Sequence, residues 1–331
     1  VAGRRQKKSG RRSYAWRYRG RIVACVFVEV IIICALVIMI GWNKGVKEWF
    51  EQFEQPVLKE VDISGINSPN AILMQARGGK ILGEINGEAQ IYPASMTKIM
   101  TVILGIENFD NLDEKITLTD EMFAGLYEQD ATQAGFQPGE EVRVIDLLYG
   151  AMLPSGAECC IALADTISGS EADFAELMNK KARKLGMENT HFCDSTGLHN
   201  PDHYSTVKDI AVLMKYCIKN DTFREIVETS RHSTGVTNIH PDGITYYSTM
   251  FKNLSDPTVT GGKILGGKTG YTSEAGHCLV SFAEIEGREY IFVSAGASGA
   301  DGNTIPHIQD AVTVYNRVGA AIEAKMNDNN K

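Results

Sequence analysis

Hydrophobic residues recur at two spacings along this chain, one typical of strands and the other typical of helices. Two short apolar runs, 71–77 and 80–86, are joined at Gly78-Gly79 and predict a β-hairpin. A helix is predicted to begin near Pro93, because apolar residues follow it at helical spacing as far as Leu104. The same spacing predicts helices at 146–153, 157–168, 171–185 and 206–219.

Three apolar runs near the C-terminal end predict further strands. The strands are predicted at 264–270, 277–284 and 290–297, and a helix is predicted at 305–324. Residues 107–260, between the hairpin and these strands, are predicted to be mostly helical. This order of hairpin, helices, strands and helix predicts one α+β domain, whose sheet combines strands from both ends of the chain around an inserted helical lobe.

The N-terminal part of the chain has the pattern of a membrane anchor. Residues 1–21 hold nine basic side chains and no acidic one, and Ile22–Ile40 is apolar apart from Glu29. This run is long enough to cross a lipid bilayer, and no Ala-x-Ala cleavage site follows it, so an uncleaved anchor is favoured over a signal peptide. The basic flank predicts a single-pass cell-membrane protein with a cytoplasmic N-terminus and an extracytoplasmic folded domain.

These features divide the chain into five predicted segments. They are a basic cytoplasmic tail at 1–21, a transmembrane anchor at 22–41, a juxtamembrane stalk at 42–61, a folded catalytic domain at 62–326 and a polar tail at 327–331. The sequence makes no prediction of the oligomeric state.

The charge balance outside the anchor argues against nucleic acid as a partner. The chain of 331 residues is 44% hydrophobic and 22% charged, which is ordinary for a globular protein. After residue 21 there remain 24 basic side chains against 40 acidic ones, once Glu29 is set aside, for a net charge of about −16. The basic tail adjoins the apolar run, so a lipid bilayer is its expected partner.

Neither the cysteines nor the histidines have the spacing of a metal site. Five cysteines follow the anchor, without a Cys-x-x-Cys pair, and buried thiols are favoured over a disulfide involving Cys193. No His-Glu-x-x-His segment occurs, and the pair His199 and His203 is interrupted by a proline. The sequence therefore predicts no metal and no cofactor.

A serine and a lysine at the predicted helix start have the spacing of a nucleophile and its base. In Ser95-Met-Thr-Lys98 the two side chains project from the same face, so the amine can take the hydroxyl proton. Ser205 and Lys208 have the same spacing, but there Ser205 or Thr206 is better explained as the N-cap of a helix.

Two further segments complete an ordered set. Ser155, in Pro154-Ser-Gly-Ala157, stands at a turn before an apolar helix and by itself would be interpreted as an N-cap. Lys268-Thr269-Gly270 puts a cation and a hydroxyl on a strand, with glycine allowing close approach to the backbone. Ser-x-x-Lys, a central serine motif and Lys-Thr-Gly in this order are the signature of β-lactamases and penicillin-binding proteins.

With this set, the sequence resembles the serine-type D-alanyl-D-alanine carboxypeptidases, which are low-molecular-weight penicillin-binding proteins of the β-lactamase-like superfamily. The resemblance covers about residues 62–325 and includes Gly197-Leu198 and His203-Tyr-Ser-Thr206. It implies an antiparallel sheet flanked by helices with an inserted helical lobe. It also implies the peptidoglycan stem peptide as substrate, removal of its terminal D-alanine through an acyl-enzyme, and β-lactams as covalent inhibitors.

The resemblance also implies roles for the motif residues. Ser95 would attack the substrate carbonyl, Lys98 would take its proton, and Ser155 would relay a proton to the leaving amine. On the third motif, Lys268 and Thr269 would hold the terminal carboxylate of the substrate, and Gly270 would let it lie against the strand. The backbone N–H groups of Ser95 and Tyr271 would form the oxyanion hole.

Ala157 departs from the family pattern, since an asparagine is usual there and the neighbouring Glu158 is no obvious replacement. The missing amide is expected to cost about 1–3 kcal/mol in the transition state. Restoring it with Ala157→Asn is expected to speed acylation with little effect on melting temperature, because a position beside the cleft should have room.

Two alternatives to a carboxypeptidase are considered. A β-lactamase is disfavoured because no Glu-x-x-Leu-Asn-like segment lies between the second and third motifs. A non-catalytic wall-binding protein would explain the loss of the amide at Ala157.

Overall fold

The computed structural model describes residues 58–254, 256–299 and 305–329. The predicted cytoplasmic tail, the anchor and most of the stalk lie outside these residues. None of the described helices is long and apolar enough to cross a membrane. Val57–Lys331 forms one compact unit, and its packing begins before residue 62, because Leu58 and Val61 are buried in its core.

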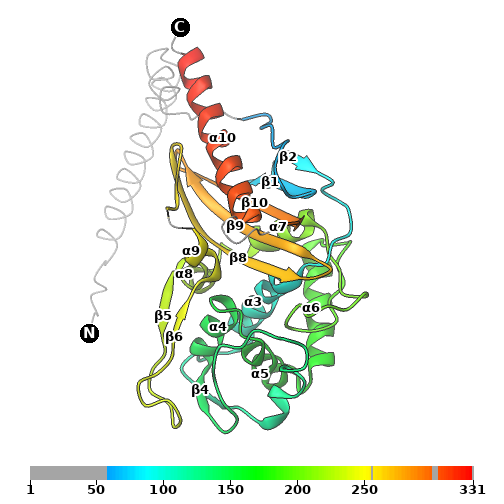
Figure 1. The fold of residues 1–331 in the computed structure, drawn as a ribbon, viewed down its shortest axis with the longest axis vertical. Coiled ribbons are helices and arrows are strands. Elements are labelled where there is room, and N and C mark those ends of the chain that lie inside the picture. Colours follow the sequence, from blue (N-terminus) through cyan, green and yellow to red (C-terminus); the bar gives the residue numbers. More distant parts are fainter. Residues whose placement is uncertain (1–57, 255, 300–304, 330–331) are drawn as a thin grey trace, which may run out of the picture. The chain divides into compact units, whose positions relative to one another are not determined.

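A six-stranded antiparallel sheet lies at the centre of this unit, with the strand order β2-β1-β10-β9-β8-β7 (Figure 1). Its strands are β1 (Asn70–Gln75), β2 (Ile81–Ile85), β7 (Thr258–Val259), β8 (Gly262–Thr272), β9 (Gly276–Ile285) and β10 (Arg288–Ala297). The N-terminal hairpin β1–β2 joins the C-terminal strands through the antiparallel pairing of β1 with β10, from Asn70↔Ala295 to Gln75↔Tyr290. The prediction that the sheet combines both ends of the chain is therefore confirmed.

Helices cover both faces of the sheet, and this explains why its central strands are apolar on both sides. Along β10, Ile291 and Val293 belong to the core shared with the helical lobe, whereas Tyr290 and Phe292 belong to the core under α10 (Pro306–Asn329). Side chains alternate across a strand, so consecutive residues serve the two cores. Tyr315 of α10 packs edge-on against the Phe292 ring, with ring centroids 6.2 Å apart.

The remaining helices lie in the lobe and at its junction with the sheet. They are α3 (Lys98–Asn108), α4 (Val144–Met152), α5 (Ala157–Ser168), α6 (Glu171–Leu185), α7 (Val207–Cys217), α8 (Asp221–Glu228) and α9 (Thr249–Asn253), with the short 3-10 helices η1 (Ala94–Thr97) and η2 (Asp120–Phe123). The four helices predicted for the lobe are confirmed to within two residues at each end. This agreement arises because their apolar faces repeat over two or more turns.

The prediction that 107–260 is mostly helical is wrong in part. Two small antiparallel pairs interrupt it, β3 (Lys115–Thr117) with β4 (Glu141–Arg143), and β5 (Arg231–Ser233) with β6 (Thr245–Tyr247). Strands of three residues are too short to show a period of two, so their existence depends on the partner strand.

The interpretation of Ser205 and Lys208 as part of a helix start is confirmed. Thr206 is the N-cap of α7, accepting from the Asp209 N–H at 3.0 Å, and Lys208 pairs with Glu88, so the Ser205 motif is structural as expected.

The five described cysteines are all free, four of them fully buried and Cys193 partly so. The preference for buried thiols over a disulfide is therefore confirmed.

Candidate active site

Ser95 and Lys98 meet at the start of the helix that the sequence predicted. Ser95 lies in the 3-10 turn η1, and Lys98 is the first residue of α3. The Lys98 amine is 3.2 Å from the Ser95 hydroxyl and donates to the Thr196 carbonyl at 2.6 Å. Lys98 is only 3% exposed, whereas Ser95 lines an open cavity, so the hydroxyl is accessible and the amine beside it is shielded from water.

Two glycines allow other backbone segments to approach this turn closely. A Cβ atom on Gly197 would lie 1.9 Å from the carbonyl oxygen of Ala94, and Gly197 has a positive φ of 80°. A Cβ atom on Gly270 would lie 3.0 Å from the Ser95 nitrogen. Strand β8 therefore runs directly against the turn, next to the Ser95 N–H, and any side chain at Gly270 would push it away.

Ser155 is not the N-cap that its local sequence suggests. Gly156 occupies the N-cap position of α5, without a side-chain hydrogen bond, and Ser155 precedes it with a φ of 75°. The Ser155 hydroxyl instead accepts from the Lys268 amine at 3.0 Å. A non-glycine residue held at positive φ is strained. In this strained conformation the Ser155 hydroxyl contacts Lys268.

Lys268 lies in β8 and is almost completely buried, at 1% exposure. Its amine donates to Ser155 and to the carbonyl of Thr269, at 3.0 and 2.9 Å. Burial, and secondly the charge of Lys98, lower the pKa of Lys268 well below its ordinary value. The ammonium form of Lys268 is therefore disfavoured, and a strongly perturbed pKa beside a cavity is typical of a functional site.

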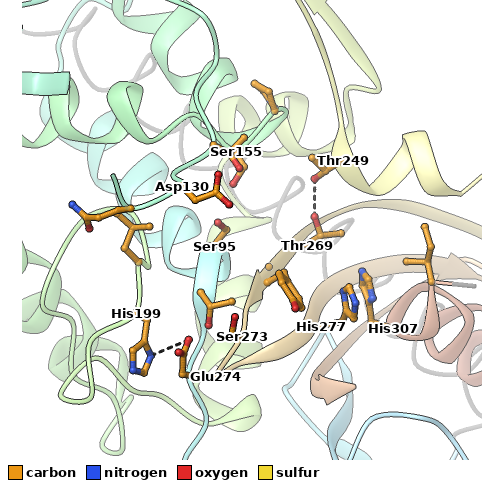
Figure 2. A pocket seen from close by; sticks show the side chains of 18 of the residues that line it. Ser95, Asp130, Ser155, His199, Thr249, Thr269, Ser273, Glu274, His277 and His307 are labelled. Atoms are coloured by element: carbon orange, nitrogen blue, oxygen red, sulfur yellow. Dashed lines mark hydrogen bonds and ion pairs between the residues drawn. The ribbon is translucent and has the colours of Figure 1, made fainter. Parts of the chain in front are cut away.

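A cavity of about 630 Å³ brings the three motifs together. Figure 2 shows Ser95 at its centre, Ser155 with Asp130 on one side, and the Thr249–Thr269 pair on another, with the two hydroxyls 2.7 Å apart. Of the predicted site residues, Ser95, Ser155, Thr269, Gly270 and Tyr271 line the cavity, and Lys98 and Lys268 are buried beside the serines.

Sequence reasoning missed several cavity-lining side chains. Thr249 comes from the short helix α9, and Gln129, Asp130 and Thr132 come from one loop of the lobe. His199 and Glu274 line another wall, with 3.8 Å between the His199 Nδ1 and a carboxylate oxygen of Glu274. These residues lie outside any motif, and no local pattern could have singled them out.

Ala157 and Glu158 are both buried, and neither belongs to the lining of the cavity. Ala157 is 1% exposed, and its N–H donates to the Thr132 carbonyl at 2.8 Å. Glu158 is fully buried, and one of its oxygens accepts from the N–H groups of Ala134 and Gly135 at 2.6 and 2.9 Å. Burial raises the pKa of this carboxyl. Glu158 therefore holds the loop and does not replace the missing amide, and the expectation of free room at Ala157 is wrong.

The burial of Ala157 changes the expected effect of Ala157→Asn on stability. Extra atoms in a filled site cost about 1–3 kcal/mol. We therefore expect the melting temperature to fall by roughly 3–10 °C, measured by differential scanning calorimetry. The exposed Ala172→Asn in α6 is the control and should change it little. An unchanged melting temperature for Ala157→Asn would show that the loop moves aside at no cost; faster acylation stays a prediction for the same samples.

Comparisons with known proteins show which family the chain resembles. The family described as D-alanyl-D-alanine carboxypeptidase (peptidase S11) matches residues 57–299. The chain is 35% identical to D-alanyl-D-alanine carboxypeptidase DacF of Bacillus subtilis over 69% of its own length and 57% of that protein. It is also 35% identical to the D-alanyl-D-alanine carboxypeptidase of Streptomyces strain K15, over 69% of its own length and 78% of the relative.

A solved structure gives the same result for the fold. The Streptomyces K15 DD-transpeptidase superposes with a TM-score of 0.69 at 29% identity, covering 79% of this chain and 100% of that one. The antiparallel sheet with its helical lobe is therefore the fold of the DD-peptidases. The chain spans less than two thirds of the length of several curated relatives, 57% for the Bacillus protein.

Proposed function

The chain belongs to the D-alanyl-D-alanine carboxypeptidase family, and from this we propose that it is a serine peptidase that removes the terminal D-alanine of peptidoglycan stem peptides. The observation that carries the proposal is the Lys98 amine 3.2 Å from the accessible Ser95 hydroxyl. A serine hydroxyl needs a base within this reach to become a nucleophile. The Lys268–Ser155 pair beside it supplies the second proton path that an acyl transfer needs.

The chemistry would proceed in two stages, acylation of Ser95 and hydrolysis of the acyl-enzyme. The Ser95 oxygen attacks the carbonyl carbon of the penultimate D-alanine while Lys98 takes the hydroxyl proton. The tetrahedral intermediate then breaks its C–N bond, and a proton passed through Ser155 goes to the amine of the departing D-alanine. Water finally cleaves the Ser95 ester and regenerates the free hydroxyl. The products are the shortened peptide and one free D-alanine for each water consumed.

The third motif would bind the terminal carboxylate of the substrate and contribute to the oxyanion hole. We propose that the terminal carboxylate lies near Lys268 and the Thr269 hydroxyl, because an anion favours the ammonium form that burial opposes. Thr249, at 2.7 Å from Thr269, would orient that hydroxyl. The oxyanion would accept from the backbone N–H groups of Ser95 and Tyr271, which the close approach of Gly270 supports.

We also propose that the enzyme is anchored in the cell membrane. The apolar run Ile22–Ile40, preceded by nine basic residues, supports a single span with a cytoplasmic N-terminus. The catalytic domain would then lie outside, where its wall substrate is found. Sensitivity to β-lactams belongs to the same proposal, because these compounds acylate a serine placed as Ser95 is placed.

The proposal predicts that the chain releases D-alanine from a stem pentapeptide ending in D-alanyl-D-alanine. Mass spectrometry should show the tetrapeptide, and a coupled enzymatic assay should show an equal amount of free D-alanine. A pentapeptide ending in D-alanyl-L-alanine is the matched control and should not be cleaved. An intact pentapeptide under conditions where penicillin still acylates Ser95 would favour the non-catalytic wall-binding alternative.

A second candidate function is suggested by the name of the solved relative. The K15 protein is called a DD-transpeptidase, and an acyl-enzyme of the same kind can pass its acyl group to an amine in place of water. Addition of glycylglycine to the pentapeptide assay distinguishes the two. A coupled peptide as the main product would indicate a transpeptidase, and a tetrapeptide would indicate a carboxypeptidase.

A further inference from the structure

His203 lies in a segment that resembles the family, yet the proposed chemistry gives it no role. Its side chain is 2% exposed and contacts Thr97, in the turn that carries Ser95 (the catalytic turn). The ring Nε2 is 2.9 Å from the Thr97 hydroxyl, and Nδ1 is 3.1 Å from a carboxylate oxygen of Asp194. Thr97 is fully buried and stands between Ser95 and Lys98 in sequence. A continuous chain of hydrogen bonds therefore runs from Asp194 to the catalytic turn.

The second oxygen of Asp194 organises the loop that receives the catalytic amine. It accepts from the N–H and hydroxyl of Thr196, both at 2.7 Å, and from the Gly197 N–H at 2.6 Å. The carbonyl of Thr196 is the acceptor of the Lys98 amine at 2.6 Å. One carboxylate thus fixes, through different atoms, both the acceptor of Lys98 and the ring that contacts Thr97.

The hydrogen-bonding capacities of these groups define their orientation. An ionised carboxylate only accepts, so the His203 Nδ1 carries the hydrogen that faces Asp194, and Nε2 faces the Thr97 hydroxyl. The Cys193 N–H also points to Nδ1, at 3.3 Å, but a protonated Nδ1 cannot accept it, and the shorter contact with Asp194 at 3.1 Å sets the position of the hydrogen. Although burial alone raises the pKa of Asp194, the hydrogen bonds from His203, Thr196 and Gly197 outweigh it and lower the pKa to about 2.

We propose that Asp194, His203 and Thr97 form a positioning network that holds Lys98 and the Ser95 turn in the geometry needed for proton transfer. None of the three lines the cavity, so the network acts through Lys98 and not on the substrate. A misplacement of about 1 Å at a reacting group can slow a reaction about 100-fold. This inference rests on the proposed function, because it requires Lys98 to act as the base.

The test separates acylation from binding. Stopped-flow fluorescence with a labelled penicillin gives the acylation rate constant and the dissociation constant of the preceding complex. We expect Asp194→Asn to lower the rate constant about 10- to 100-fold and to leave the dissociation constant within about threefold. The amide keeps one acceptor oxygen for the loop N–H groups, and the NH2 group that then faces Nδ1 cannot accept its hydrogen, which favours the other ring tautomer.

Asp310 provides a matched control for the loss of a buried carboxylate. It is 1% exposed and accepts four hydrogen bonds, from the backbone and side chains of Asn67 and Ser68, between 2.6 and 2.9 Å. Asp310→Asn should lower the melting temperature about as much as Asp194→Asn does, with an unchanged acylation rate. Equal losses of rate in the two variants would assign both effects to stability and overturn the proposal.

Thr97 tests the same network without a change of charge. Thr97→Val removes the hydroxyl and should slow acylation, and Thr97→Ser retains it and should restore the rate to within about threefold of the wild type. Equal rates in these two variants overturn the proposal even if Asp194→Asn does not fold. Wild-type protein that forms no adduct at Ser95 contradicts the proposed function, and the network then has no base to position. Normal wild-type acylation with unchanged variants contradicts the network alone.

Discussion

Replacing Ser95 by alanine is expected to abolish the covalent adduct with a labelled penicillin. It should also lower D-alanine release roughly 10⁴- to 10⁶-fold, as expected for loss of a catalytic nucleophile. The reason is that the proposed mechanism transfers the acyl group to the Ser95 oxygen, which is the hydroxyl that the Lys98 amine contacts, at 3.2 Å. Gel fluorescence, with mass spectrometry of the labelled peptide, measures the adduct.

Ser205→Ala is the matched control for this experiment. Ser205 has the same spacing to a lysine, but it is fully buried and its hydroxyl lies 2.8 Å from that of Thr190. This variant should label normally. Labelling that survives Ser95→Ala would refute the assignment of the nucleophile. In the wild type the adduct should be long-lived, and rapid turnover of penicillin would indicate the β-lactamase alternative.

Gly197→Ala is expected to damage both stability and acylation. The added Cβ would lie 1.9 Å from the Ala94 carbonyl oxygen, so the turn that carries Ser95 must move. Positive φ adds about 1–2 kcal/mol for a residue with a Cβ, and overpacking adds about 1–3 kcal/mol. We expect the melting temperature to fall by roughly 10 °C and penicillin labelling to slow about 100-fold.

Gly186→Ala separates the two causes. Gly186 ends α6 with the same φ of 80°, but nothing lies within 4 Å of the position of its Cβ. It should therefore show only the conformational cost, a fall of a few degrees, with normal labelling. Two results together would contradict this prediction: a melting temperature of Gly197→Ala that falls no further than that of Gly186→Ala, and penicillin labelling of Gly197→Ala at the normal rate. The contact with Ala94 would then not constrain the turn.

The elements with long regular patterns could be predicted from the sequence. The hairpin 71–86, helices α5 and α6, and strands β8 to β10 follow from apolar spacing, because burial on one face of a helix or strand imposes a local period. Ser95 and Lys98 could be paired for a similar reason. Two residues three positions apart at a helix start are neighbours, whatever surrounds them.

Only the tertiary structure decided what the other site residues do. Ser155 looks like an N-cap in its own segment, and its contact with Lys268 joins positions 113 residues apart. Ala157 looked free because a cleft was expected there, yet a loop that no pattern predicted covers it. His203 had no role until folding brought it to Thr97, 106 residues away. The sequence by itself determined the helices, the main strands and the Ser95–Lys98 pair, because these depend on neighbours along the chain. Which hydroxyls, carbonyls and carboxylates surround them was decided by packing between distant segments, and a local period carries no information about such contacts.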